Sequence, residues 1–297
     1  MKTVVIGTIF VDIKGFPLST FIPTGRNAGR VEQNHGGVGR NIAESLNNLG
    51  ADAVLVTLAD HTGISADVLG HLREVGVNCD YIMKTDDGMG TWLAVFDEHG
   101  DVYASISKRP DLMPILDILN QYGDEIFEGA SGVLPELDME EPLLDKIFEL
   151  AERHHVKVYS AISNMTIGQE RIDYFRRSDC LVCNQLEAGI LFDEDTEKLS
   201  SDEMLEMLIR EIKRLEIPEM IVTMGEDGCI YASIDGESGY CPAQKVKVVD
   251  TTGAGDSFFA GLSYALQEGR SLKEACTYAC GVSAQVIQSL SNVYIKK

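Results

Sequence analysis

Residues 250–256 read Asp-Thr-Thr-Gly-Ala-Gly-Asp, and a run with helical spacing, Ser257–Leu266, follows directly. A Gly-Ala-Gly turn that opens a helix leaves backbone N–H groups unpaired at the positive end of the helix dipole, so it can bind an anion. Asp256 stands beside this turn, where a carboxylate repels an anion unless it has a task such as accepting a proton from an attacking hydroxyl. The alternative interpretation is a plain glycine-rich turn with Asp256 as a favourable first-turn residue.

Strand-like and helix-like runs alternate through most of the chain. Short apolar runs predict buried strands, and apolar residues three or four positions apart predict helices. This alternation is typical of an α/β fold with a mostly parallel sheet and helices on both faces. The expected strands are Val4–Ile6, Ala53–Thr57, Gly132–Leu134, Val156–Ser160, Leu181–Cys183 and Met220–Thr223, and the expected helices are Val38–Leu49, Ala66–Val75, Pro142–Arg153 and Ser201–Leu215.

Two segments, at about 15–34 and 90–107, break this alternation. The first is rich in Gly, Pro, Thr and Asn without a helical period, and the second predicts a hairpin with its turn at Asp97–Gly100. We expect both to form a small β lid that closes over a ligand, the alternative being a hairpin that merely decorates the sheet edge. Residues 1–297 are otherwise expected to form a single domain.

Composition narrows the class of protein. The 297 residues are 44% hydrophobic and carry 47 acidic against 25 basic side chains, a formal net charge of −22. Because such a surface repels nucleic acid and anionic membranes, neither is an expected partner. No run approaches the length of a membrane span, and the N-terminus lacks a signal-peptide pattern, so we expect a soluble cytoplasmic protein.

A second glycine-rich run, Gly36-Gly-Val-Gly39, precedes the first expected helix. It is neither G-x-G-x-x-G nor a Walker A loop, which disfavours a nicotinamide-binding fold and a P-loop ATPase. The glycines still allow a ligand to lie against bare backbone within reach of Asn41. Asp12 follows the first strand, at the edge where α/β sheets bind ligands, and its carboxylate can accept two hydrogen bonds from a vicinal diol; a turn or cap residue is the plainer interpretation.

Two further motifs follow later strands. Asn184-Gln-Leu-Glu187 places an amide and a carboxylate one helical turn apart, which could hold hydrated Mg²⁺ beside phosphates or form an ordinary capping box. Thr223-Met-Gly-Glu-Asp-Gly228 ends a strand and begins a hairpin, and it could line a nucleotide base or simply be a turn.

Together these motifs resemble the ribokinase-like (PfkB) family of carbohydrate kinases. The resemblance rests on Gly36-Gly-Val-Gly-Arg-Asn-Ile-Ala43, on Asp250–Asp256 and on Asn184–Glu187 as an N-x-x-E motif, in the family's order, and it covers essentially the whole chain. It implies a ribokinase-like three-layer fold with a small β lid. The motifs look closest to those of pseudouridine kinases, although Ser160-Ala-Ile-Ser-Asn164 departs from their pattern after the fourth core strand.

The resemblance also implies a role for each matching residue. Asp256 would take the proton from the acceptor hydroxyl, and the backbone of Gly253, Ala254 and Gly255 would hold the transferred phosphoryl group. The remaining roles are sugar binding by Asp12, Gly36, Gly37 and Asn41, ordering of Mg²⁺ (through water at Glu187) and phosphate by Asn184 and Glu187, flanking of ATP by Thr223, Gly225 and Gly228, and binding of a monovalent cation such as K⁺ by Asp250 and Thr252.

We therefore expect ATP-dependent phosphorylation of a primary hydroxyl on a ribose-like acceptor, a nucleoside such as pseudouridine. One alternative is a free-sugar kinase for ribose, a ketohexose or a sugar acid. Another is a catalytically silent sugar- or nucleotide-binding regulator, which the intact Asp256 disfavours. Apolar side chains on both faces of Trp92–Phe96, with the resemblance, predict a homodimer through the lid. The cations Arg26, Arg30, Lys108 and Arg109 in the lid keep a phosphosugar acceptor open.

Overall fold

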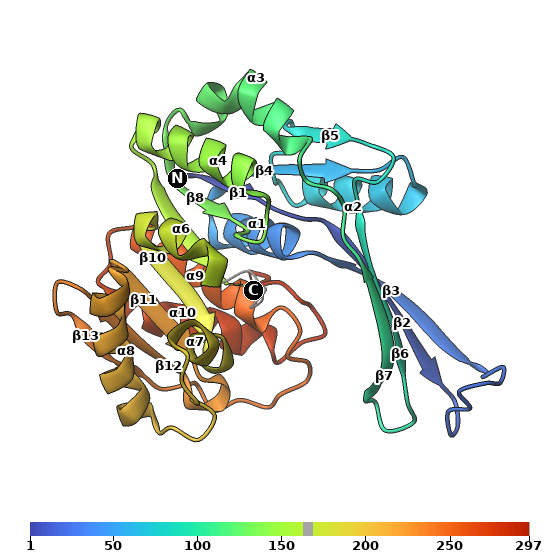
Figure 1. The fold of residues 1–297 in the computed structure, drawn as a ribbon. Coiled ribbons are helices and arrows are strands. Elements are labelled where there is room, and N and C mark those ends of the chain that lie inside the picture. Colours follow the sequence, from blue (N-terminus) through green and yellow to red (C-terminus); the bar gives the residue numbers. More distant parts are fainter. Residues whose placement is uncertain (163–168, 297) are drawn as a thin grey trace.

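The computed structural model describes residues 1–162 and 169–296, and it contains two sheets. A nine-stranded sheet has the order β13-β12-β11-β10-β9-β8-β1-β4-β5, and a four-stranded sheet has the order β3-β2-β6-β7. The large sheet lies among the helices, whereas the small sheet projects from one side of the molecule (Figure 1). Ser163 and Asn164, the last two residues of the run 160–164 that differs from the pseudouridine kinase pattern, lie outside the described residues.

The large sheet is parallel except at one edge. All of the strands expected from the apolar runs are present, within two residues of their expected ends at most positions. The parallel strands are β1 (Lys2–Ile6), β4 (Asp52–Ala59), β5 (Ile82–Lys84), β8 (Ala130–Pro135), β9 (Lys157–Ala161), β10 (Cys180–Asn184) and β11 (Glu219–Thr223), and the antiparallel edge consists of β12 (Cys229–Ser233) and β13 (Ser238–Cys241).

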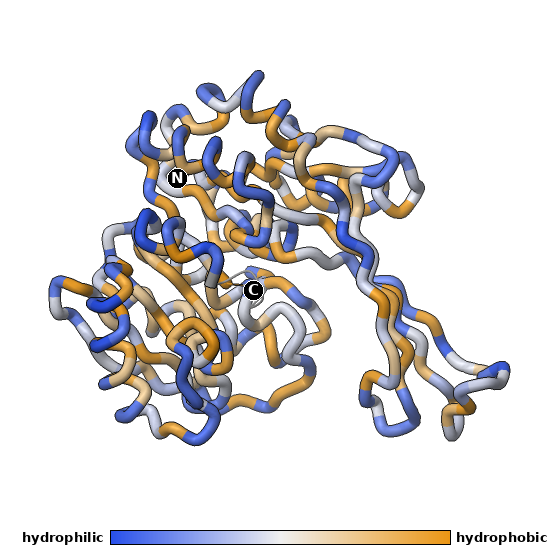
Figure 2. The backbone as a smooth tube through the Cα atoms, in the orientation of Figure 1, coloured by the Kyte–Doolittle hydropathy of each residue, from blue (hydrophilic) through white to orange (hydrophobic). Residues whose placement is uncertain are grey.

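Helices cover both faces of this sheet and create two hydrophobic cores. Because side chains alternate along a strand, Val4 and Ile6 lie in one core and Val5 in the other. The strands are therefore apolar on both sides, and their residues are accordingly largely hydrophobic along the backbone in Figure 2. One face holds α1 (Val38–Leu49), α2 (Gly63–Glu74), α9 (Ala254–Gln267) and α10 (Leu272–Val286), and the other holds α3 (Ile115–Phe127), α4 (Glu141–His154), α6 (Ile172–Arg177), α7 (Gln185–Phe192) and α8 (Ser201–Leu215).

The order of the strands places a crevice beside β1. The chain first adds β4 on one side of β1 and later adds β8 on the other, so the connections from these neighbours diverge. Ligands of open α/β sheets bind outside the carboxyl ends of the strands at such a switch point. Here those ends lead to Thr8 after β1 and to Glu136 after β8.

The small sheet contains the predicted hairpin together with the first irregular segment. The hairpin forms β6 (Gly90–Phe96) and β7 (Val102–Lys108), and the first segment contributes β2 (Phe10–Pro17) and β3 (Gly29–Gly36). β2 begins at Phe10, before the start expected near residue 15. The hairpin therefore pairs within this second sheet and not on the edge of the large one.

The register gives the small sheet two distinct faces. Asp12 pairs with Trp92 and points to the crevice side, whereas Ile13 pairs with Leu93 and points to the outer side. The outer face exposes apolar side chains, Val31 and Ile106 at 70% each. In the part of the chain that the structure describes, no helix is both long and apolar enough to cross a membrane.

Candidate functional site

A cavity of about 290 Å³ lies at the carboxyl ends of β1 and β8, under the small sheet. Asp12, Gly37, Asn41 and Asp256, which the sequence motifs singled out, all line it. Arg109, one of the cations noted in the lid, also lines it, together with Phe10, Trp92, Glu136 and Asp138. The fold thus brings residues from the beginning, middle and end of the chain to one place.

The helix that carries Asp256 begins as its sequence predicts. Gly253 is the N-cap with φ of 75°, and α9 starts at Ala254. The backbone N–H groups of Gly255 and Asp256 have no acceptor among the described residues, as expected for a first helical turn. A Cβ at Gly255 would meet no atom within 4 Å other than those of its chain neighbours and its own helix, so the surface at this turn is open on that side. This arrangement can hold an anion.

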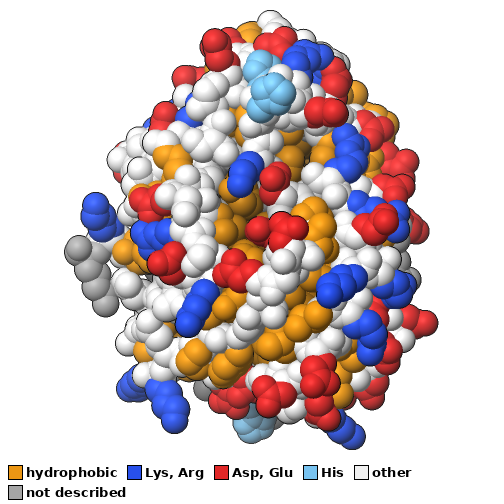
Figure 3. All heavy atoms as spheres, turned by 90° about the vertical axis from the view of Figure 1, so that its left-hand side faces the viewer, with side chains coloured by type: hydrophobic (Ala, Val, Ile, Leu, Met, Phe, Trp, Pro, Cys, Tyr) orange, Lys and Arg blue, Asp and Glu red, His pale blue; other side chains and the backbone are white. Residues whose placement is uncertain are grey.

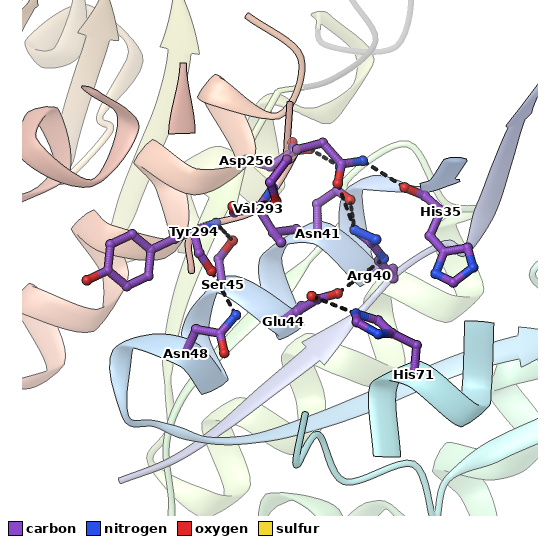
Figure 4. Close-up of polar contacts among 12 residues, drawn as sticks. His35, Arg40, Asn41, Glu44, Ser45, Asn48, His71, Asp256, Val293 and Tyr294 are labelled. Atoms are coloured by element: carbon purple, nitrogen blue, oxygen red, sulfur yellow. Dashed lines mark hydrogen bonds and ion pairs between the residues drawn. The ribbon is translucent and has the colours of Figure 1, made fainter. Parts of the chain in front are cut away.

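Asn41 and Asp256 form a direct hydrogen bond across the cavity. The Asn41 Nδ2 donates to Asp256 Oδ2 at 2.7 Å, and so joins α1 to α9 (Figure 4). Burial raises the pKa of Asp256 to about 6, while the Asn41 hydrogen bond and the Arg40 charge act in the opposite direction and Asp12 adds to the increase. Asp256 is therefore a carboxylate near neutral pH, but one that binds a proton more readily than an exposed aspartate does.

Arg40 fixes the orientation of Asn41. Its side chain is 4% exposed, and Nη1 donates to Asn41 Oδ1 at 2.7 Å and to Asn292 Oδ1 at 3.1 Å, while Nε lies 3.5 Å from Glu44 Oε2. Because the Asn41 oxygen is occupied by Arg40, its amide N–H faces Asp256 (Figure 4). Arg40 lies inside the quoted Gly36–Ala43 run, but the sequence does not reveal this buried role.

Asp12 lies on β2, and its carboxylate faces the glycine backbone at Gly36. Burial raises its pKa, opposed by Lys14 and Arg40. A Cβ at Gly36 would lie 2.8 Å from Asp12 Oδ1, and one at Gly37, where φ is 97°, would lie 2.5 Å from the Thr8 carbonyl oxygen. Gly37 therefore requires glycine, whereas a side chain at Gly36 would displace the Asp12 carboxylate, and bare backbone lies beside that carboxylate.

Glu136 joins three segments at the switch point, and the sequence motifs missed it. Its Oε1 accepts hydrogen bonds from Thr8 N at 2.7 Å and Gly39 N at 2.8 Å, so it holds the end of β1 against the start of α1. Burial raises the pKa of Glu136 to about 7, with the nearby Asp138 carboxylate adding to the increase. The available signal was its position directly after the apolar run Gly132–Leu134, where α/β sheets place functional groups.

The motifs assigned to a nucleotide lie farther along the same edge of the sheet. Asn184 is the N-cap of α7 and forms a capping box with Glu187, in which each side chain accepts from the other's backbone N–H at 2.8 Å. Thr223 pairs with Asn184 in the β10–β11 register. Gly225 and Gly228 form the following turn, and a Cβ at Gly228 would lie 2.1 Å from the Cys241 carbonyl oxygen.

The capping box uses one carboxylate oxygen of Glu187 for the backbone, and burial raises the pKa of this side chain. Among the described residues, no group of three or more His, Cys, Asp or Glu side chains is placed to hold a metal ion. The expected contact of Glu187 with Mg²⁺ through water stays a prediction.

Asp250 and Thr252 line a second cavity of about 270 Å³ that also contains Asp12 and Arg40. Asp250 Oδ1 accepts a hydrogen bond from Thr252 N at 2.8 Å, so the two residues support one another within this loop. This cavity and the 290 Å³ cavity share Asp12 as a lining residue, so Asp250 and Thr252 lie near the first cavity. Whether they also bind a cation stays a prediction.

A larger cavity, about 550 Å³, lies at the opposite edge of the sheet, where the strands begin. Lys157, Asp179, Glu219 and Arg270 are among its lining residues. Figure 3 shows this side of the molecule, on which acidic, basic and hydrophobic side chains are interspersed. None of the motif residues lies there, and carboxyl ends rather than amino ends of strands hold ligands in such sheets, so we place the site at the smaller cavity.

Comparison with known proteins shows which family the sequence of this chain matches. Residues 1–294 match the family described as pfkB family carbohydrate kinase. The chain is 31% identical over 293 residues to guanosine-inosine kinase of Exiguobacterium acetylicum, covering 98% of this chain and 96% of that one. It is 27% identical over 286 residues to pseudouridine kinase of Escherichia coli K12, covering 96% and 90%. Arabidopsis thaliana ribokinase, complexed with ribose and ATP, has the same fold, with a TM-score of 0.84 at 20% identity over 99% and 96% of the two chains.

The anion-binding turn yields a test of its two glycines. A Cβ at Gly253 would lie 1.9 Å from the Asn292 carbonyl oxygen at a left-handed φ, so Gly253→Ala should lower the free energy of unfolding by about 1–3 kcal/mol. Gly255→Ala, the matched control, should leave stability unchanged or slightly higher because its Cβ enters open space. Urea unfolding followed by circular dichroism measures both, and equal effects of the two substitutions would contradict this account of the turn.

Proposed function

The chain belongs to the pfkB family of carbohydrate kinases, and on that premise we propose that it transfers the terminal phosphoryl group of ATP to the primary hydroxyl of a nucleoside's ribose. The observation that carries this proposal is the Asp256 carboxylate, held by Asn41 beside an open helix N-terminus in the cavity that Asp12 also lines. The names of the two relatives, both of them nucleoside kinases, support a nucleoside over a free sugar.

In the proposed reaction, the hydroxyl proton moves to Asp256 while the hydroxyl oxygen forms a bond to the terminal phosphorus of ATP. The bond between that phosphorus and the bridging oxygen breaks, and ADP leaves. The turn at Gly253–Gly255 would hold the phosphoryl oxygens, chiefly through the Gly255 and Asp256 N–H groups, because the Ala254 N–H already donates to the Thr251 carbonyl oxygen at 3.2 Å. Mg²⁺ would supply charge neutralisation for the phosphates.

The acceptor would lie between the small sheet and α1. Asp12 would accept hydrogen bonds from two ribose hydroxyls, with Gly36 and Gly37 presenting bare backbone and Asn41 donating nearby. Cations of the small sheet are largely neutralised, since Arg30 pairs with Glu32, Lys108 with Asp87, and Arg109 with Asp138. This pairing supports an uncharged acceptor rather than a phosphosugar.

ATP would lie along the edge formed by β10 and β11. Asn184 and Glu187 would face its phosphates and Mg²⁺, while Thr223, Gly225 and Gly228 would flank the rest of the nucleotide. The net charge of −22 supports a small-molecule partner rather than nucleic acid.

Replacing the proposed base tests the chemistry. Asp256→Asn should lower kcat by roughly 10²–10⁴-fold, the usual loss for a general base, while ATP affinity stays near that of the wild type. Its melting temperature at pH 7.5 should not fall, because the raised pKa means that ionised Asp256 costs stability once the pH exceeds that pKa. Steady-state kinetics and calorimetry measure these quantities.

For the wild type, kcat/KM should rise with pH through about 6 as Asp256 loses its proton. Near wild-type turnover in Asp256→Asn, or a flat profile between pH 5 and 7, would remove Asp256 from this role.

A second substitution tests the acceptor site. Asp12→Ala should weaken or abolish acceptor binding and spare ATP, because two unpaired sugar hydroxyls cost about 1–3 kcal/mol each when buried. Titration calorimetry measures both ligands, and Trp92, the only tryptophan, lines the cavity and gives a fluorescence signal for the acceptor. Loss of ATP binding with intact acceptor binding would show that the two sites are reversed.

The outer face of the small sheet supports the proposed homodimer. Val31 and Ile106 are 70% exposed there and Leu93 is 42% exposed, and a thin sheet cannot bury both faces on its own core. A second copy meeting this face in a two-fold arrangement would cover it.

A charge on this face tests that arrangement. Ile106→Lys should convert a dimer to monomers, because pairing would bury the new ammonium group. Ile234→Lys, at an exposed apolar residue away from the small sheet, is the control and should stay dimeric. Light scattering at micromolar concentration decides, and a monomeric wild type or a dimeric Ile106→Lys would show that the outer face does not mediate assembly.

A further inference from the structure

Asp138 lines the cavity and carries one buried carboxylate oxygen without a partner. Its side chain is 5% exposed, and one oxygen, Oδ2, accepts a hydrogen bond from Arg109 Nη1. The other oxygen, Oδ1, has no hydrogen-bond partner among the described residues. Buried carboxylate oxygens without donors are rare because the desolvation is not compensated, so this atom is expected to meet a donor from a ligand.

Arg109 places unused donors beside that acceptor. Its side chain is 38% exposed, and its polar partners among the described residues are two carboxylates, Asp138 through Nη1 and Glu136 Oε2 at 3.8 Å from Nη2. A guanidinium has five N–H groups in a fixed plane, so donors remain for a ligand. Together, Arg109 and Asp138 offer a donor next to an acceptor within one small area of the cavity.

This pair is separate from the groups proposed for the sugar. Asp12, Asn41 and Asp256 serve the ribose, whereas the neighbouring Glu136 is already occupied by the backbone of Thr8 and Gly39. The aromatic rings of Trp92 and Phe10 line the same cavity. A group that extends from the ribose could therefore meet aromatic surface and the Arg109–Asp138 pair together.

We propose that Arg109 and Asp138 recognise the lactam edge of a nucleobase, a ring carbonyl next to a ring N–H, with the base packed on Trp92. Arg109 donates to the carbonyl and Asp138 Oδ1 accepts from the ring N–H, as a bidentate pair. This inference rests on the proposed nucleoside kinase activity and names its substrate class: nucleosides of 6-oxopurines or of uracil.

Adenosine presents the opposite pattern and is rejected. Its amino group is a donor and would face the donors of Arg109. Its unprotonated ring nitrogen is an acceptor and would face the acceptor oxygen of Asp138. Sites built to pair with a particular N–H discriminate strongly, because their own buried groups are otherwise left unpaired. Guanosine, inosine and pseudouridine, the nucleosides in the names of two similar proteins, all carry a lactam edge.

The first experiment changes the substrate and leaves the protein unaltered. Wild-type kcat/KM is measured with inosine, guanosine, N1-methylinosine, adenosine and ribose, and with uridine, pseudouridine and 3-methyluridine. Methylation replaces the lactam N–H while keeping the carbonyl, so each methylated nucleoside should be at least ~100-fold worse than its parent. Adenosine should be equally poor. If the inosine and guanosine values exceed those of uridine and pseudouridine, the preferred base is a 6-oxopurine; the reverse order identifies uracil.

The second experiment changes the protein. Asp138→Asn keeps the shape of the side chain but loses its charge, and it should lower kcat/KM for the preferred nucleoside roughly 100-fold, mainly through KM. The ratio between the parent and the methylated nucleoside should shrink towards one. Asp87→Asn, a carboxylate paired with Lys108 on the small sheet, is the control and should preserve the ratio.

The possible outcomes separate this inference from the kinase activity itself. Active enzyme that treats a nucleoside and its methylated form alike, or that prefers adenosine, overturns the lactam proposal and leaves the kinase proposal standing. Absence of turnover with every acceptor overturns the kinase proposal. In that case calorimetry with inosine and N1-methylinosine, and with uridine and 3-methyluridine, decides: equal affinities within both pairs overturn the lactam proposal too.

Discussion

The hydrogen bond from Asn41 to Asp256 is the contact on which the rest of the site depends, because it joins helices from opposite ends of the chain. A carboxylate placed at a helix N-terminus beside another carboxylate, Asp12, is costly to bury in its charged form, and its pKa rises accordingly. The amide of Asn41 and the charge of Arg40 limit that rise. Arg40 in turn reaches Asn292, so the C-terminal segment, α1 and α9 are held in one network of polar contacts.

A second constraint fixes where this network lies. Glu136, at the carboxyl end of β8, accepts N–H groups from Thr8 and Gly39, and so aligns the end of β1 with the start of α1 at the switch point of the sheet. A Cβ at Gly39 would lie 2.8 Å from the Gly7 backbone, so α1 can approach this closely only without a side chain there. The two hydrophobic cores beneath supply the rigidity that a costly polar site requires.

Much of this fold could be predicted from sequence, because its central strands are apolar on both faces and its main helices have a clear apolar stripe. The helix α10 was not predicted, since Leu272–Val286 packs against α9 and the last strands and carries many buried small residues that give no clean period. The glycine runs and Asp256 were recognisable because the chemistry is local. Glu136 and Asp138 were not recognisable, because their roles depend on contacts with Thr8 and Arg109. These residues are distant in the sequence and meet their partners only in the folded chain.

The central claim is that Asp256 directs a primary ribose hydroxyl to the terminal phosphorus of ATP. The most direct measurement is ³¹P NMR and mass spectrometry of the product formed by the wild-type protein from ATP, Mg²⁺ and the best nucleoside of the panel. The account predicts ADP and a single nucleoside monophosphate whose phosphorus couples to the two hydrogens of the 5′ carbon. Phosphate on a ring hydroxyl, or free inorganic phosphate without a phosphorylated nucleoside, would contradict it.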